Sequence, residues 1–170
     1  MSKIFTRTLL MVVAGMMSVT VQAADLNLTG TVVASPCRVD SGSVSKDIDF
    51  GQLQSTDLKE AGTASDWMPF QIKLTGCPQA TSKATVTFSG TPATEDATLY
   101  ANSGTAENVA VQMALEADKA TVLGNASSMT VDIDAQHNAV YELAGRLLTV
   151  NGNTGPGTFS SIVQMNFTYQ

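Results

Sequence analysis

Residues 159–170 read FSSIVQMNFTYQ, and up to Tyr169 they alternate between two kinds of side chain. One face carries Phe159, Val163, Met165, Phe167 and Tyr169, with Ser161 as its small polar member, and the other carries Ser160, Gln164, Asn166 and Thr168. This period of two is typical of a β-strand with one buried face. Because the sequence ends one residue later, we expect the strand to lie at a sheet edge or to need backbone from another chain beside it.

The first 23 residues have the layout of a secretory signal peptide. Lys3 and Arg7 come first, an apolar run follows at residues 9–17, and residues 21–23 read VQA, which gives a signal peptidase small residues to recognise. We therefore expect cleavage after Ala23. A permanent membrane anchor is the alternative, but the run is shorter than the about 20 residues of a spanning helix. We expect no membrane anchor in the mature chain.

The charge and composition of the chain argue against a nucleic-acid-binding protein and for a single domain rich in β-strands. The chain has nine basic and fifteen acidic residues, and cleavage would remove only Lys3 and Arg7, which leaves 147 residues with a net charge of −8. Such an acidic chain is not expected to bind nucleic acid. Its length suits one compact domain. Only 14% of the residues are charged, and Thr, Ser, Val and Gly are abundant, which favours strands and turns.

Cys37 and Cys77 are the two cysteines of the chain. In an exported protein they are expected to form a disulfide, because the compartment is oxidising. A redox or metal pair is the alternative, but neither a Cys-x-x-Cys spacing nor a nearby histidine supports it. The disulfide would place the first strand beside the end of a strand near residue 75.

Short segments of period two, separated by turn residues, follow one another along the chain, and helical periodicity is nearly absent. We expect extended segments at residues 26–34, 48–50, 70–74, 86–88, 109–115, 129–133 and 141–147, and from 159 to the end. Residues 91–108 leave room for a short helix. The pattern predicts an all-β fold, an antiparallel sandwich of immunoglobulin-like type.

Taken together, these features resemble the pilin subunits of chaperone-usher fimbriae. The residues that carry the resemblance are the alternating extension with Gly30, the pair Cys37 and Cys77, Gly157 fourteen residues from the end counting inclusively, and the penultimate Tyr169. Three stretches are most similar to the G-type minor subunit of type 1 fimbriae, a tip adaptor: residues 61–67 (AGTASDW), 103–108 (SGTAEN) and 146–152 (RLLTVNG).

The resemblance implies an incomplete sandwich, completed by a donor strand from another chain. Residues 1–23 would be the signal peptide, 24–35 a donor-strand extension and 36–170 the pilin domain. A periplasmic chaperone would first fill the groove, and the extension of an adjacent subunit would replace it at the outer-membrane usher. The acceptor groove for chaperone and subunits would be lined by Gly157, Phe159, Val163, Met165, Phe167 and Tyr169. Ordinary core of a complete sandwich is the alternative for these residues.

The donor residues are expected at Leu26, Leu28, Gly30 and Val32, which share one face of the extension. Each apolar side chain that enters a neighbour's groove would contribute about 1.5 to 3 kcal/mol of transfer free energy before ordering costs. Gly30 on this face points to a close backbone approach. A β-bulge is the alternative explanation for Gly30.

No constellation predicts catalysis or a cofactor. His137 stands alone in an expected loop, and no Ser-His-Asp set can be assembled around it. The pair Asp47 and Asp49, and the pair Asp132 and Asp134, lack the glycine and glutamate of a calcium loop. The sequence therefore predicts a structural fimbrial subunit at the cell surface of a Gram-negative bacterium, exported through the periplasm, without enzymatic activity, cofactor or metal. A major rod pilin and a complete secreted immunoglobulin-like binding module are the alternatives.

Overall fold

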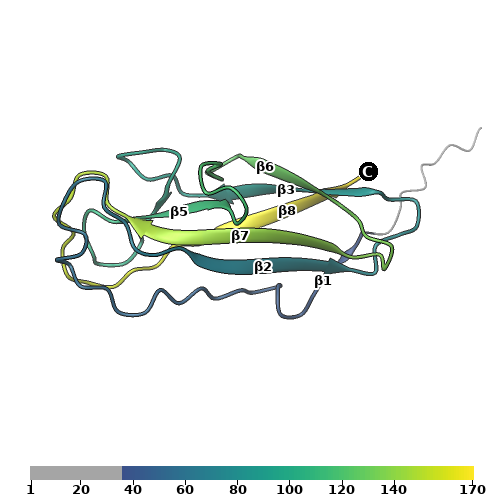
Figure 1. Cartoon of the computed structure of the whole chain (residues 1–170), viewed down its shortest axis with the longest axis horizontal. Helices are drawn as coiled ribbons and strands as arrows, with labels where there is room; N and C mark the ends of the chain where they lie inside the picture. Colours follow the sequence, from purple (N-terminus) through teal and green to yellow (C-terminus); the bar gives the residue numbers. More distant parts are fainter. Residues whose placement is uncertain (1–35) are drawn as a thin grey trace, which may run out of the picture. The chain divides into compact units, whose positions relative to one another are not determined.

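The computed structural model describes residues 36–170, and in this range the chain forms strands and turns without a helix (Figure 1). The expected signal peptide, residues 1–23, and the expected extension, residues 24–35 with Leu26, Leu28, Gly30 and Val32, lie outside the described residues.

All strand pairs are antiparallel, and the strands form two sheets. The five-stranded sheet has the order β1-β2-β7-β5-β4, with β1 at Arg38–Val39, β2 at Met68–Thr75, β7 at Ala139–Leu148, β5 at Ala110–Leu115 and β4 at Tyr100–Ala101. The three-stranded sheet has the order β6-β3-β8, with β6 at Ser128–Asp132, β3 at Lys83–Gly90 and β8 at Val163–Tyr169. The predicted all-β antiparallel sandwich is confirmed, and β4 occupies the region that left room for a helix.

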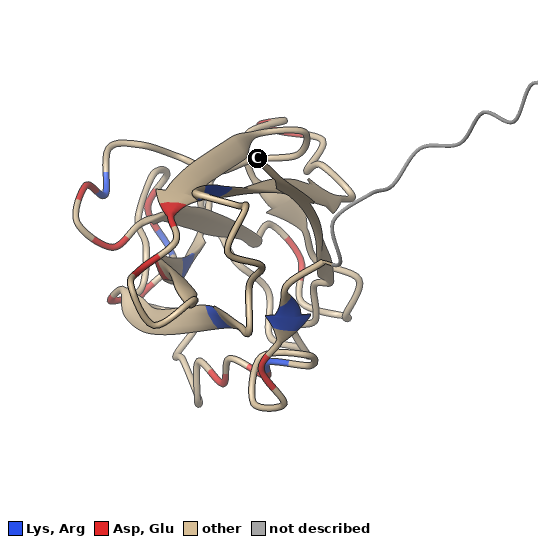
Figure 2. Ribbon diagram, turned by 90° about the vertical axis from the view of Figure 1, so that its right-hand side faces the viewer, with Lys and Arg blue, Asp and Glu red and all other residues tan. Residues whose placement is uncertain are grey.

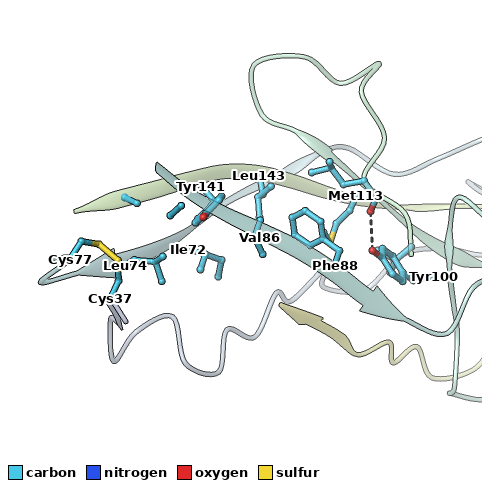
Figure 3. Packing of buried hydrophobic residues seen from close by; sticks show 14 of the residues in the cluster. Cys37, Ile72, Leu74, Cys77, Val86, Phe88, Tyr100, Met113, Tyr141 and Leu143 are labelled. Carbon is cyan, nitrogen blue, oxygen red and sulfur yellow. Dashed lines mark hydrogen bonds between the residues drawn. A yellow bond between two sulfur atoms is a disulfide. The ribbon is translucent and has the colours of Figure 1, made fainter. Parts of the chain in front are cut away.

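The core lies between the two sheets because alternate residues of the long strands point inward. Val86 and Phe88 of β3 are completely buried, as are Tyr141 and Leu143 of β7. Figure 3 shows these side chains in one row between the sheets. The charged residues lie mostly in loops and on the outer faces, as the view along the sandwich in Figure 2 shows. The sequence pattern therefore sets which face of each strand is buried.

The two ends of the core are closed by different bonds (Figure 3). At one end Cys37, directly before β1, is disulfide-bonded to Cys77, which follows β2. This confirms the predicted disulfide. The bridge brings β1, which the sequence did not predict, beside the end of β2. At the other end the buried Tyr100 hydroxyl donates a hydrogen bond to the Leu123 carbonyl at 3.0 Å.

Two predicted strand boundaries are wrong. Residues 48–50 do not form a strand, because no backbone ladder of the described chain joins them to a neighbour. The terminal strand begins at Val163 and not at Phe159, because its ladder to β3 ends at the pair Gly90 and Val163. Before that point the backbone of residues 158–160 bonds to a loop instead: the N–H of Ser103 donates to Ser160 at 2.8 Å.

Candidate functional site: an open groove between two sheet edges

An open groove runs between one edge of each sheet. Its first wall is β8 with residues 159–162, its second wall is Val39 with residues 43–50, and strands β2, β5 and β7 form its floor. Within residues 36–170, β8 pairs only with β3 and β1 only with β2, so both walls present unpaired backbone. The groove has a volume of about 930 Å³. Unpaired edges of this kind are templates for a further strand.

The β8 wall is apolar toward the groove. Val163, Met165 and Phe167 line the groove and remain partly exposed, whereas Val86 and Phe88 on the neighbouring β3 are completely buried. The inward side chains of β8 are thus covered on the edge that pairs with β3, and they are open to the groove on the opposite edge. The ring centroid of Phe167 lies 5.7 Å from that of Tyr141, which ties this wall to the core.

Beyond Val39, the second wall consists of residues 43–50, which take part in no strand pairing within the described part of the chain. At its start, the Asp40 N–H donates to the Lys73 carbonyl at 2.9 Å, and the Lys73 N–H donates to the Ser43 hydroxyl at 3.0 Å. The segment then runs beside β2 (Figure 1), and Val44 is 71% exposed. At its end, Phe50 meets Phe159 of the first wall edge to face, with ring centroids 6.2 Å apart.

The disulfide holds the beginning of the second wall. β1 pairs with β2 through only Arg38 and Val39, and Val39 lines the groove. A two-residue ladder is too short to fix a strand by itself. The bond between Cys37 and Cys77 therefore supports the position of Val39.

A hydrogen-bonded loop holds the beginning of the first wall. The Asn102 amide nitrogen donates to the carbonyls of Ala106 at 2.8 Å and Thr158 at 3.3 Å, and its oxygen accepts from the N–H groups of Gly104 and Ser160 at 2.8 Å each. The four bonds use the full capacity of one amide side chain. The bonds to Thr158 and Ser160 fix the backbone on both sides of Phe159, and the other two hold the loop itself.

The sequence-predicted residues fall into three groups. Phe159, Val163, Met165 and Phe167 line the groove. Tyr169, at the far end of β8, pairs with Ala84 and packs partly buried against the core, where burial raises its pKa. Gly157 lies against the 102–106 loop, where a Cβ would collide with the backbone of Thr105 and Ala106. The close approach explains this glycine, but Gly157 does not itself line the groove.

Sequence reasoning missed the floor and the second wall. Their apolar lining residues are Val39, Val44, Ile48, Phe50, Phe70, Ile72, Val111 and Met113, and Gly145 lies among them. The inward positions of β2 and β5 have the same alternation as ordinary core, so no sequence signal separates the two. The segment 48–50 did carry a signal in its alternation, which we assigned to a strand.

The groove offers little chemistry besides apolar contact and backbone pairing. Its charged lining residues are Lys46 and Asp47. In the part of the chain that the structure describes, no three His, Cys, Asp or Glu side chains gather to hold a metal ion. His137 lies in a turn, with a φ of 61°, and its N–H donates to the Asp134 carbonyl at 2.9 Å. Residues 36–170 contain no helix that is long and apolar enough to cross a membrane.

An antiparallel sandwich with an open groove between two sheet edges defines an incomplete immunoglobulin-like domain. Comparisons with known proteins agree with this class. The sequence profile described as "Fimbrial protein" matches residues 26–170. The chain is 39% identical over 155 residues to Protein FimG of Escherichia coli K12, covering 89% of both chains, and 35% identical over its whole length to the fimbrial-like protein YdeR of the same strain. The crystal structure of the P pilus rod subunit PapA superposes with a TM-score of 0.67 at 22% identity, over 80% of this chain and 100% of PapA.

The chain therefore belongs to the fimbrial protein family and is a structural subunit of a chaperone-usher fimbria. Subunits of this family assemble with neighbouring subunits and reach the cell-surface fimbria through the periplasm. The resemblance recognised in the sequence is confirmed.

Proposed function

We propose that this protein is a tip adaptor that accepts a strand from one neighbouring subunit and donates a strand to the other. The observation that supports this proposal is the groove, where the edge of β8, unpaired within residues 36–170, faces a wall in which only Val39 belongs to a strand. Donor-strand complementation between pilins is an established example of β-strand addition. A strand laid along β8 would pair with its free backbone groups and cover Val163, Met165 and Phe167.

The acceptor role is supported by the partial exposure of Val163, Met165 and Phe167, which an incoming strand would cover. Each apolar side chain that an incoming strand places in the groove would contribute about 1.5 to 3 kcal/mol, since the walls are already apolar. The ordering of the incoming strand offsets part of this gain. We propose that a periplasmic chaperone occupies the groove first and that a subunit extension replaces it at the usher. Gly157 and Tyr169 would act from the ends of the first wall, as supports and not as lining residues.

The donor half concerns residues 24–35, for which we keep the predicted boundaries: 1–23 as signal peptide, 24–35 as extension and 36–170 as pilin domain. Leu26, Leu28 and Val32 would enter the groove of the other neighbour, with Gly30 at the closest backbone approach. The alternating pattern of this stretch and its place directly before Cys37 support the proposal.

The adaptor role is favoured over a major rod pilin by two observations. The match to FimG extends over 89% of the chain, and the three stretches at residues 61–67, 103–108 and 146–152 are most similar to the G-type subunit. The likeness to the PapA rod subunit at 22% identity concerns the fold alone. We further propose that the protein has no enzymatic activity, because in the described residues no hydrogen bond joins a serine of the groove lining to Lys46 or Asp47, its charged residues.

Two variants on one strand test the acceptor role. Met165→Asp places a charge in the groove, whereas Thr168→Asp places the same charge on the exposed face of β8. With the cognate chaperone and usher co-expressed, Met165→Asp is expected to abolish incorporation into fimbriae, and Thr168→Asp to retain it. Equal incorporation of both variants would refute the groove as the acceptor.

A deletion tests the donor role separately. Removal of residues 24–35 leaves the groove residues in place, so the protein should still bind its chaperone and still accept a strand. It should fail to join the neighbour whose groove its extension would fill. Co-purification with the chaperone and with each neighbouring subunit measures the three contacts, and loss of the chaperone complex would contradict the division of roles.

A further inference from the structure

A row of three side chains crosses the outer face of the five-stranded sheet, on the side away from the groove. Gln112 of β5 pairs directly with Arg146 of β7, and Trp67 directly precedes β2, whose first residue Met68 pairs with Gly145. Side chains alternate along a strand, so Arg146 points outward while Gly145 lines the groove on the inner face. We call Trp67, Arg146 and Gln112 the outer row, and it is separate from the acceptor groove.

Arg146 is the centre of the outer row. Its Cζ lies 4.5 Å from the centroid of the Trp67 ring, and its Nε donates a hydrogen bond to Oε1 of Gln112 at 2.7 Å. A guanidinium that stacks on an aromatic ring and is bonded through Nε is held in one orientation. Its two Nη groups, by contrast, donate no hydrogen bond within residues 36–170. They present a pair of oriented donors.

The charge of Arg146 is not balanced by a carboxylate of the described chain, because Arg146 takes part in neither of the two ion pairs there. Glu116 pairs with Lys119 at 2.6 Å, and Glu142, on the same face of β7, accepts hydrogen bonds from the Gln71 amide at 2.8 Å. Burial lowers the pKa of the Arg146 guanidinium, since part of its surface is withdrawn from water. A partly buried cation without a partner favours an anion brought from outside.

The surroundings of the outer row combine an apolar base with further donors. Ala114 and Ala144 pair with each other on the same face of the sheet and are completely buried. All three members of the row remain partly exposed. Lys119, in the loop after β5, brings its Nζ to 5.8 Å from the centroid of the Trp67 ring. A ligand at the row would therefore meet an aromatic surface, an unpaired guanidinium and an ammonium group at the rim.

We propose that the outer row binds the carboxylate of an acidic sugar, with Arg146 as the anchor. A carboxylate matches the two Nη donors as a bidentate pair. The sugar hydroxyl groups would accept hydrogen bonds from the Gln112 amide and the Lys119 ammonium, and the ring carbons would lie against the exposed part of Trp67. An acidic peptide suits the row less, because it would bring several negative charges to a chain with fifteen acidic and nine basic residues.

Trp67 can report on its own site, since it is the only tryptophan of the chain. The full exported chain is labelled with the heavy nitrogen isotope, and the indole N–H signal of Trp67 is followed by NMR. Sodium glucuronate is titrated at constant ionic strength. Glucose, which lacks the carboxylate, and a glutamate residue blocked at both ends, which lacks the sugar ring, are the comparison ligands.

Three variants complete the test. Arg146→Gln removes the anchor, and Lys119→Gln changes only the rim, so that the proposal does not depend on one substitution. Lys73→Gln is the matched control, because it removes the same charge from an exposed outward position of β2. The signal of each variant without ligand shows whether the fold is kept.

The wild-type protein is expected to bind glucuronate about tenfold more tightly than glucose, and more tightly than the blocked glutamate. Arg146→Gln should weaken glucuronate binding by about tenfold, Lys119→Gln by less, and Lys73→Gln should leave it unchanged. If glucuronate does not move the indole signal, or glucose moves it equally, the site is refuted and the acceptor groove is unaffected. If the blocked glutamate binds more tightly than glucuronate, the assignment to an acidic sugar is wrong and an acidic protein partner takes its place.

Discussion

Removal of the disulfide is expected to lower the free energy of unfolding of the domain substantially. The bond between Cys37 and Cys77 spans a sequence separation of 40 residues. In the chain-entropy model, a loop of this length stabilises the folded state by about 4 kcal/mol at 25 °C. Small domains have a total free energy of unfolding of about 5 to 15 kcal/mol. The double variant Cys37→Ala with Cys77→Ala should therefore unfold at a much lower urea concentration than the oxidised protein.

The same perturbation reaches the groove, because Val39 follows the bridge by two residues and is otherwise held by a two-residue ladder. Urea unfolding of the full chain, followed by circular dichroism, gives the free energy of unfolding for oxidised protein, reduced protein and the double variant. Reduced wild-type protein is the control, since it keeps both sulfur atoms and lacks the bond. The two unbridged forms should agree within about 1 kcal/mol. If the double variant is as stable as the oxidised protein, the loop-closure argument is wrong.

Three further outcomes can be measured on the same protein. Phe167→Ala removes the ring that packs on Tyr141 and should lower the free energy of unfolding by about 2 kcal/mol. This is less than the loss expected at a fully buried phenylalanine, because Phe167 is partly exposed. Thr168→Ala, on the exposed face of the same strand, is the control and should change the free energy of unfolding by less than about 0.5 kcal/mol. Asn102→Ala removes four hydrogen bonds, two within the 102–106 loop and two to Thr158 and Ser160. It should cost about 2 kcal/mol in urea unfolding, and a cost near zero would contradict the anchoring role. Burial raises the pKa of Tyr100 from 10.0 to about 12. Since the unfolded state loses this proton first, stability should hold below about pH 10 and fall between about pH 10 and 12, and this fall should be smaller in Tyr100→Phe.

The sequence by itself determined the six longer strands, β2, β3, β5, β6, β7 and β8, to within a few residues, and which side of each strand faces inward. A period of two forces alternate side chains to opposite faces, so Val86 and Phe88 or Tyr141 and Leu143 could be assigned to the core without knowledge of their neighbours. The disulfide followed from the presence of two cysteines in a chain whose first 23 residues are predicted to be an export signal. The wall of Val163, Met165 and Phe167 was recognisable for the same reason as the core.

The tertiary structure decided which inward residues line a groove and which are sealed in the core, because alternation reports only the inward face and not what covers it. Phe70 and Met113 have the pattern of core residues, yet they form the floor of an open site. The strand expected at residues 48–50 failed for a related reason: a strand needs backbone beside it, and its own sequence cannot supply that partner. Gly145 and Phe50 are 95 positions apart in the sequence, yet a Cβ at Gly145 would lie 3.4 Å from Cζ of Phe50. Only the tertiary structure brings these two residues into contact.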